Sequence, residues 1–227
     1  VCSLGFNALD NGVPSFVTAS HCTLVQGGTE GTPYFQETWL DFSGLGTMIG
    51  TEAEDPVYFS SPRRRRGACP RNRVCRYSDA SRAQYSIPAD ADKVALGHIA
   101  RTSGPNNGSI TITGSFNITA EGSAVLGQVN KVGRTTGWTQ GQVSATCVNV
   151  NVDGTAITQL CQTLVGSDLP GPVLVGAGDS GSPVFIVNGD PNVTLAGILW
   201  GGNLAGTLFA FSPLANIEQE LGPLTTF

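Results

Sequence analysis

The chain contains a serine in a glycine-rich setting and a histidine whose neighbours suggest a chemical role. Ser180 stands in "VGAGDSGSPVF" (175–185), and His21 stands in "FVTASHC" (16–22). A serine hydroxyl is a weak nucleophile until a base removes its proton, and a neutral imidazole is the usual base. The glycines around Ser180 remove side-chain bulk, so a substrate could reach the hydroxyl and the neighbouring backbone N–H groups. The pair predicts nucleophilic catalysis; the alternative is a glycine-rich loop that enters a strand.

Such a pair needs a carboxylate that holds the imidazole in the right tautomer and stabilises its charged form. Two aspartates are candidates on the family resemblance given below, which implies that the acid lies between the histidine and the serine in the chain. Asp79 lies in "CRYSDAS" and has small neighbours that would let it pack beneath the imidazole, whereas Asp92 lies in "DADKVAL" before an apolar run. We favour Asp79 as the third residue and keep Asp92 open.

The elements that must position these residues are β-strands. The 227 residues include 30 Gly and 13 Pro, and 40% are hydrophobic, which suits a globular protein with a substantial core. Short β-type runs alternate with turn signals such as "DNG" (10–12) and "NGD" (188–190). Only "LANIEQEL" (214–221) has helical periodicity. The pattern predicts a closed or sandwiched antiparallel β protein with a short C-terminal helix.

The six cysteines form no CxxC pair, and zinc binding is therefore not expected. Three disulfides formed in an oxidising compartment explain an even number of cysteines better. Six cysteines allow about 15 pairings. Position in the chain favours three short-range bridges, Cys2–Cys22, Cys69–Cys75 and Cys147–Cys161. We expect no metal and no cofactor.

The charge of the chain is uneven. The net charge is −5, yet "SPRRRRGACPRNRVCR" (61–76) carries seven of the ten arginines. No aromatic residue lies among them, so a solvated insertion loop is favoured over a polyanion-binding patch, and no nucleic-acid partner is expected. No apolar run approaches the ~20 residues that cross a bilayer, so we expect no membrane partner. Three N-glycosylation acceptor patterns begin at Asn107, Asn117 and Asn192.

Four sequence blocks occur in an order that resembles the chymotrypsin-like serine proteases. "SHC" is followed much later by "GDSGSP", and "CSLGFNA" (2–8) and "GRTTGWT" (133–139) are similar to the secreted microbial branch, the streptogrisin and α-lytic protease type. The resemblance implies an all-β fold of two antiparallel six-stranded β-barrels with the site in the cleft between them. We place the first barrel, with the arginine-rich insertion, at residues 1–120 and the second at 121–227.

The resemblance also assigns roles around Ser180. The backbone N–H groups of Gly178 and Ser180 would form the oxyanion hole. Only 20 residues precede His21, so Val1 is not expected to reach Asp179, and Arg134 of the "GRTTG" block would pair with Asp179 instead. The strand that opens the first barrel of the relatives is missing or shortened here.

The same resemblance places the substrate pocket. Leu174 would lie at the pocket base, or else simply pack in the core. "LWGG" would form the substrate-binding strand, and glycines would line the pocket walls; the residues concerned are Leu199, Trp200, Gly201 and Gly206. The pocket base carries no acid, so large apolar side chains are expected. Two departures weaken this assignment: Leu199 replaces a serine of the relatives, and the cysteines of a bracing bridge are missing.

The sequence therefore predicts a secreted, monomeric, glycosylated serine endopeptidase that hydrolyses proteins or peptides through an acyl-enzyme. Its catalytic triad would be His21, Asp79 and Ser180. The alternative is a protein of the same fold that works by binding, as an effector, with little or no hydrolysis.

Overall fold

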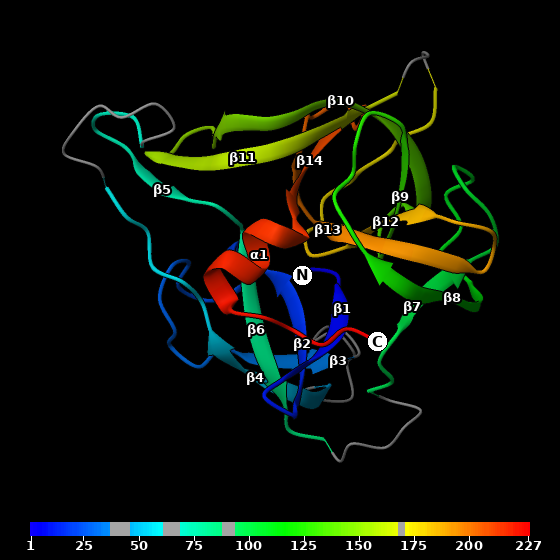
Figure 1. Cartoon of the computed structure of the whole chain (residues 1–227), viewed down its shortest axis with the longest axis horizontal. Helices are drawn as coiled ribbons and strands as arrows, with labels where there is room; N and C mark the ends of the chain where they lie inside the picture. The colour runs from blue at the N-terminus through cyan, green and yellow to red at the C-terminus, as the bar shows by residue number, and fades with distance from the viewer. Residues whose placement is uncertain (37–45, 61–68, 88–93, 168–170) are drawn as a thin grey trace.

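The computed structural model describes residues 1–36, 46–60, 69–87, 94–167 and 171–227, and the regular secondary structure of these residues is almost entirely β-strand. Within these ranges two β-sheets form the body of the molecule, and one α-helix, α1 (Leu214–Leu221), packs against the sheets (Figure 1). The predicted all-β class with a short C-terminal helix is confirmed. None of the helices in these ranges is long and apolar enough to cross a bilayer.

The first sheet has five antiparallel strands in the spatial order β1-β2-β6-β4-β3. Its strands are β1 (Phe6–Asp10), β2 (Val13–Ala19), β3 (Pro33–Gln36), β4 (Thr47–Glu54) and β6 (Ala80–Tyr85). Asn11 and Gly12 make the β1–β2 turn, and both have positive φ, as a two-residue hairpin turn requires. Within the described residues β1 and β3 do not pair, so the six-stranded closure expected for this barrel is not observed there.

The second sheet contains a closed barrel of six strands. They are β9 (Gln128–Gly133), β10 (Gly137–Asn151), β11 (Ile157–Gly166), β12 (Pro183–Val187), β13 (Asn192–Gly202) and β14 (Leu208–Pro213). The ring closes because β12 pairs with both β9 and β13. The predicted six-stranded second barrel is therefore present.

Three further strands extend this barrel. β7 (His98–Thr102) pairs with β8 (Ile112–Glu121), which runs parallel to β13, and β5 (Val74–Arg76) runs parallel to β11 (Figure 1). Over the residues that the structure describes, the sheets thus hold nine strands and five strands instead of six and six. Strand pairing joins residues 98–121 to the second sheet, although the expected first barrel extended to residue 120. The boundary between the two domains stays a prediction.

One apolar core joins the two sheets. Phe6 and Val17 of the first sheet belong to the same buried cluster as Phe116 and Phe185 of the second, and α1 adds Leu214, Ile217 and Leu221, which are its predicted apolar face. Because this cluster contains residues of both sheets, burial of its apolar surface holds the two sheets together.

All three expected disulfides are present: Cys2–Cys22, Cys69–Cys75 and Cys147–Cys161. The first has the longest sequence separation, 20 residues. It fastens the N-terminal segment beside the turn that carries His21. That segment therefore becomes a fixed part of the functional region.

Candidate active site

His21 and Asp79 meet because they lie just beyond the same end of two paired strands. Strand β2 ends at Ala19, β6 begins at Ala80, and these two residues are opposite each other in the antiparallel ladder. A single 3₁₀ turn, Ser20–Cys22, then directs the imidazole toward Asp79. The His21 Nδ1 to Asp79 Oδ2 distance is 2.5 Å.

Three further hydrogen bonds fix the position of Asp79, whose side chain is 2% exposed. The backbone N–H of His21 donates to Asp79 Oδ1 at 3.3 Å, and Gln26 Nε2 donates to the same oxygen at 2.9 Å. The backbone N–H of Asp79 donates to Ser212 Oγ at 2.9 Å. No sequence pattern pointed to Gln26, because a glutamine in a glycine-rich loop shows no periodicity or spacing that marks its partner.

The electrostatics of the pair favour the charged imidazole. Burial alone would lower the pKa of His21, but the hydrogen bond and the negative charge of Asp79 outweigh it and raise the pKa above its usual 6.5. The His21 side chain remains 34% exposed. The imidazole is therefore partly open to solvent, while its Nδ1 is bonded to a buried carboxylate.

Ser180 is half-buried in the turn before β12, beside the strand β2 that leads to His21. Its carbonyl accepts a 2.8 Å hydrogen bond from the Ser3 N–H, and Ser3 follows the cysteine bridged to Cys22. A Cβ atom built on Gly181 would lie 2.5 Å from Thr18 Oγ1 and 3.2 Å from the Ala19 nitrogen. The serine loop thus packs directly on the end of β2. Within the described chain, the Ser180 hydroxyl makes no hydrogen bond of its own.

Two backbone donors in this loop are free. Asp179 N–H donates to Gly176 O at 3.0 Å, but the N–H groups of Gly178 and Ser180 have no acceptor among the described residues. Gly178 has φ +99°, a conformation that L side chains rarely adopt. Its carbonyl is occupied by Ser3 Oγ at 2.9 Å. The arrangement leaves two N–H groups able to bind an oxyanion.

Asp179 pairs with Lys131, and the predicted pair with Arg134 is wrong. Lys131 Nζ lies 3.1 Å from Asp179 Oδ2, and both side chains are completely buried. Burial alone would raise the pKa of Asp179, but the charge of Lys131, together with hydrogen bonds such as that from the Thr136 hydroxyl, lowers it. The "GRTTG" block still contributes, because the Thr135 N–H donates to Asp179 Oδ1 at 2.9 Å.

The side chains of Lys131 and Arg134 point in different directions. Lys131 lies inside the second barrel on β9, and its ammonium also donates to Gly137 O at 3.1 Å. Arg134 follows the end of β9 and is exposed. The sequence did not single out Lys131, since its strand also carries the polar residues Gln128 and Asn130, and the resemblance to the microbial block favoured the arginine.

The predicted pocket residues divide into buried and open positions. Leu174 and Leu199 are almost completely buried in the core of the second barrel. Leu174 therefore packs in the core, which was the alternative to a place at the pocket base. Trp200 is 9% exposed and donates from Nε1 to Gln162 at 2.8 Å. A Cβ atom on Gly201 would meet no atom within 4 Å, whereas one on Gly206 would collide with Val173. Open space therefore lies at Gly201.

Part of the arginine-rich segment is structural. Arg76 is completely buried, and its Nη1 bonds Asp55 at 2.7 Å and the Ser20 hydroxyl at 2.8 Å, directly beneath the His21 turn. Burial alone would lower the pKa of Arg76, but Asp55 and Glu220 raise it. The expectation of a solvated loop is thus wrong for Arg76. Residues 63–66 and Asp92 lie outside the described residues.

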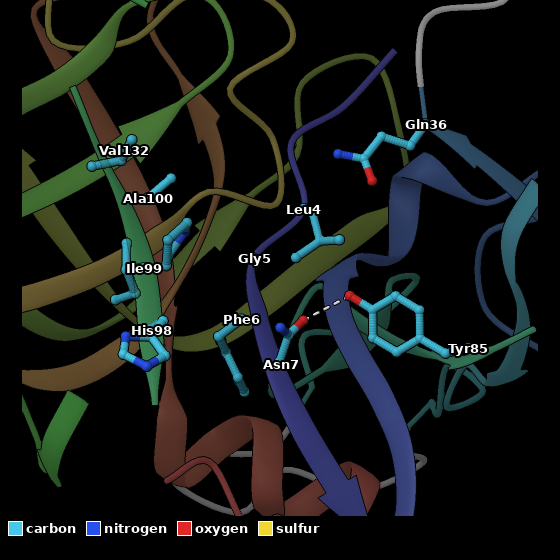
Figure 2. Close-up of a pocket in the computed structure, with 11 residues that line it drawn as sticks. Leu4, Gly5, Phe6, Asn7, Gln36, Tyr85, His98, Ile99, Ala100 and Val132 are labelled. Carbon is cyan, nitrogen blue, oxygen red and sulfur yellow. Dashed lines mark hydrogen bonds between the residues drawn. The ribbon is translucent and has the colours of Figure 1, made fainter. Parts of the chain in front are cut away.

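The other histidine, His98, lies elsewhere. It lines a cavity of about 260 Å³ between β1 and β7, where Tyr85 donates to Asn7 at 2.7 Å (Figure 2). His21 itself lies near the sulfur atoms of Cys2 and Cys22. Those cysteines are joined as a disulfide and are not thiolate ligands for a metal.

We predict that Lys131→Met destabilises the protein by about 3–5 kcal/mol at neutral pH, because it leaves the buried Asp179 carboxylate unpaired. Arg134→Ala is the matched control, and we expect a change within about 0.5 kcal/mol. The lowered pKa of Asp179 means that the pair stabilises the fold above the unfolded value of 3.8 and loses this effect as the pH falls through the folded pKa. Urea unfolding at several pH values measures the free energy of unfolding of each variant and its pH dependence. A larger loss for Arg134→Ala would contradict the assignment.

Comparison with solved structures identifies the fold. A glutamic acid specific serine protease aligns with the whole chain and 93% of its own, at 20% identity and TM-score 0.63. Thermobifida fusca protease A aligns with the whole chain and 92% of its own, at 23% identity and TM-score 0.60. Cellulomonas bogoriensis chymotrypsin aligns with the whole chain and 90% of its own, at 23% identity and TM-score 0.58. No curated protein matches the chain significantly.

These structural neighbours are chymotrypsin-like microbial serine proteases, as the sequence blocks predicted, and at such identities the likeness establishes the fold. The sequence profile of the Nal1 C-terminal domain matches residues 89–219, which is more than half of the 227-residue chain. The protein belongs to the Nal1 C-terminal domain family and has a chymotrypsin-like fold.

Proposed function

We propose that the protein is a serine endopeptidase with Ser180 as nucleophile, His21 as general acid and base, and Asp79 as the residue that orients His21. The observation that carries the proposal is the 2.5 Å hydrogen bond between His21 and a buried Asp79. It lies beside a loop that presents a free hydroxyl and two free N–H groups. The fold of the structural neighbours, which are peptidases, supports the same reaction class.

In the proposed reaction, His21 Nε2 takes the proton of Ser180 Oγ as this oxygen attacks the peptide carbonyl. The carbonyl oxygen becomes an oxyanion that the N–H groups of Gly178 and Ser180 stabilise, each donor being worth about 10²–10³ in rate. The imidazolium then gives its proton to the leaving amine, and an acyl-enzyme remains. Water deprotonated by His21 hydrolyses the acyl-enzyme and restores Ser180. Asp79 stays ionised throughout and stabilises the imidazolium.

The proposed substrates are proteins or peptides with a large apolar residue before the scissile bond. The open space at Gly201 supports room for a large side chain, and the absence of an acid at the expected pocket base, Leu174, supports an apolar one. We further propose that the protein acts outside the cell as a monomer, carries glycans at its acceptor asparagines and needs no cofactor. The three disulfides support an oxidising compartment. The alternative is a binding or effector protein of protease fold.

A fluorophosphonate probe separates these functions. We expect it to label the wild type and not Ser180→Ala, and we expect Asp79→Asn to lower turnover by about 10⁴ because the imidazole loses its orienting carboxylate. Asp92→Asn is the matched control and should keep wild-type turnover. Failure of the wild type to react favours the binding protein, and loss of turnover in Asp92→Asn alone moves the acid to Asp92.

The pH dependence of kcat/KM tests the role of His21. Only the neutral imidazole accepts the proton of Ser180, and its pKa is raised in the folded enzyme. Activity should therefore fall on acidification with a midpoint above 6.5. A midpoint below that value would mean that Asp79 does not act on the imidazole as proposed.

Cleavage of a mixed peptide library, read by mass spectrometry, measures side-chain preference. We expect Phe, Tyr, Leu or Met before the scissile bond, because an apolar pocket gains free energy from burying an apolar side chain. Ser180→Ala serves as the blank. A preference for Lys, Arg, Asp or Glu at this position would be inconsistent with the proposed pocket.

A further inference from the structure

Arg134 is an exposed cation without a partner in the described structure. The arginines that lie on described strands each bind a carboxylate: Arg76 binds Asp55, Arg82 binds Asp10, and Arg101 binds Asp190. The guanidinium of Arg134 makes no ion pair or hydrogen bond with a described residue. Its expected partner, Asp179, is buried and already held by Lys131. The charge of Arg134 is thus available to a ligand.

Arg134 lies against the loop that would bind the oxyanion. A Cβ atom built on Gly178 would be 2.9 Å from Arg134 Nη1 and 3.6 Å from its Cδ, so the side chain packs over this glycine. The backbone on either side is fixed: Arg134 N–H donates to Ser3 Oγ at 3.0 Å, and Thr135 N–H donates to Asp179 at 2.9 Å. A flexible side chain therefore begins from an anchored backbone next to the proposed reaction centre.

The anchor also indicates which half of a substrate Arg134 meets. Ser3 follows Cys2, which is bridged to Cys22, the neighbour of His21. In the proposed reaction His21 delivers a proton to the leaving amine, so the leaving half of the peptide lies on this side of Ser180. The half of the peptide before the scissile bond would instead lie along the "LWGG" strand, where the open space at Gly201 is found.

We propose that Arg134 selects substrates with an acidic side chain at the first or second residue after the scissile bond. The proposal rests on the serine endopeptidase function. A guanidinium binds a carboxylate through charge-assisted hydrogen bonds, which can be bidentate. The net charge of the whole chain is −5, which disfavours an acidic substrate at long range, so an acidic preference at this position requires a local cation.

The test compares peptides that are identical except for Glu, Gln or Lys at these two positions. For the wild type we expect kcat/KM for the Glu peptide to exceed that for its isosteric Gln peptide by about fivefold, the size of an exposed ion pair. The ratio should decrease at 1 M salt, because surface charges are screened. It should approach one in Arg134→Gln, and Arg134→Glu should prefer the Lys peptide.

The ratio is independent of the amount of active enzyme, so a partly folded variant does not disturb it. Arg134→Lys should keep part of the preference, and Arg71→Glu, at an exposed arginine of the Cys69–Cys75 loop, makes the same charge change and should leave the ratio as in the wild type. Equal rates for the Glu and Gln peptides, or an acidic preference that persists in Arg134→Glu, would overturn the proposal. If the wild type cleaves no peptide and fluorophosphonate does not label Ser180, the endopeptidase function itself fails.

Discussion

The site depends on the antiparallel pairing of β2 with β6. Because Ala19 lies opposite Ala80, the residues just beyond this shared end are brought within hydrogen-bond distance, although His21 and Asp79 are 58 positions apart in the chain. A shift of one residue in register would turn every side chain of a strand to its other face. Burial of Val17 and Ala83 on these two strands opposes such a shift.

Two buried ion pairs support the two halves of this region. Arg76 and Asp55 lie beneath the His21 turn, and Lys131 and Asp179 lie beneath the Ser180 loop. Removing charges from water is costly, so such pairs contribute little net stability, but breaking one of them leaves an uncompensated charge. Each pair therefore acts chiefly as a constraint on geometry. The two glycines that flank Asp179 and Ser180 in this loop, Gly178 and Gly181, both have positive φ.

The N-terminal segment connects the two halves. Ser3 bonds the carbonyls of Ser180 and Gly178 and accepts from Arg134, while the adjacent Cys2 is bridged to Cys22. A few residues thus tie the histidine turn, the serine loop and the "GRTTG" block together. Closing a loop of about 20 residues by a disulfide contributes roughly 3 kcal/mol in the chain-entropy model. The bridge also places polar groups of Ser3 where the loop needs partners.

The sequence by itself determined the class of fold and singled out the residues that we propose for catalysis. Glycines around Ser180, the "DNG" turn and the apolar face of 214–221 act locally, and each is found where it was predicted. The three short-range disulfides were predictable for the same reason. Only the tertiary structure decided that Lys131 rather than Arg134 meets Asp179, that Gln26 reaches Asp79, and that Arg76 is buried. These contacts depend on the direction of side chains from strands and loops that are distant in the sequence, and neither spacing nor composition contains that direction, because it follows from the tertiary fold.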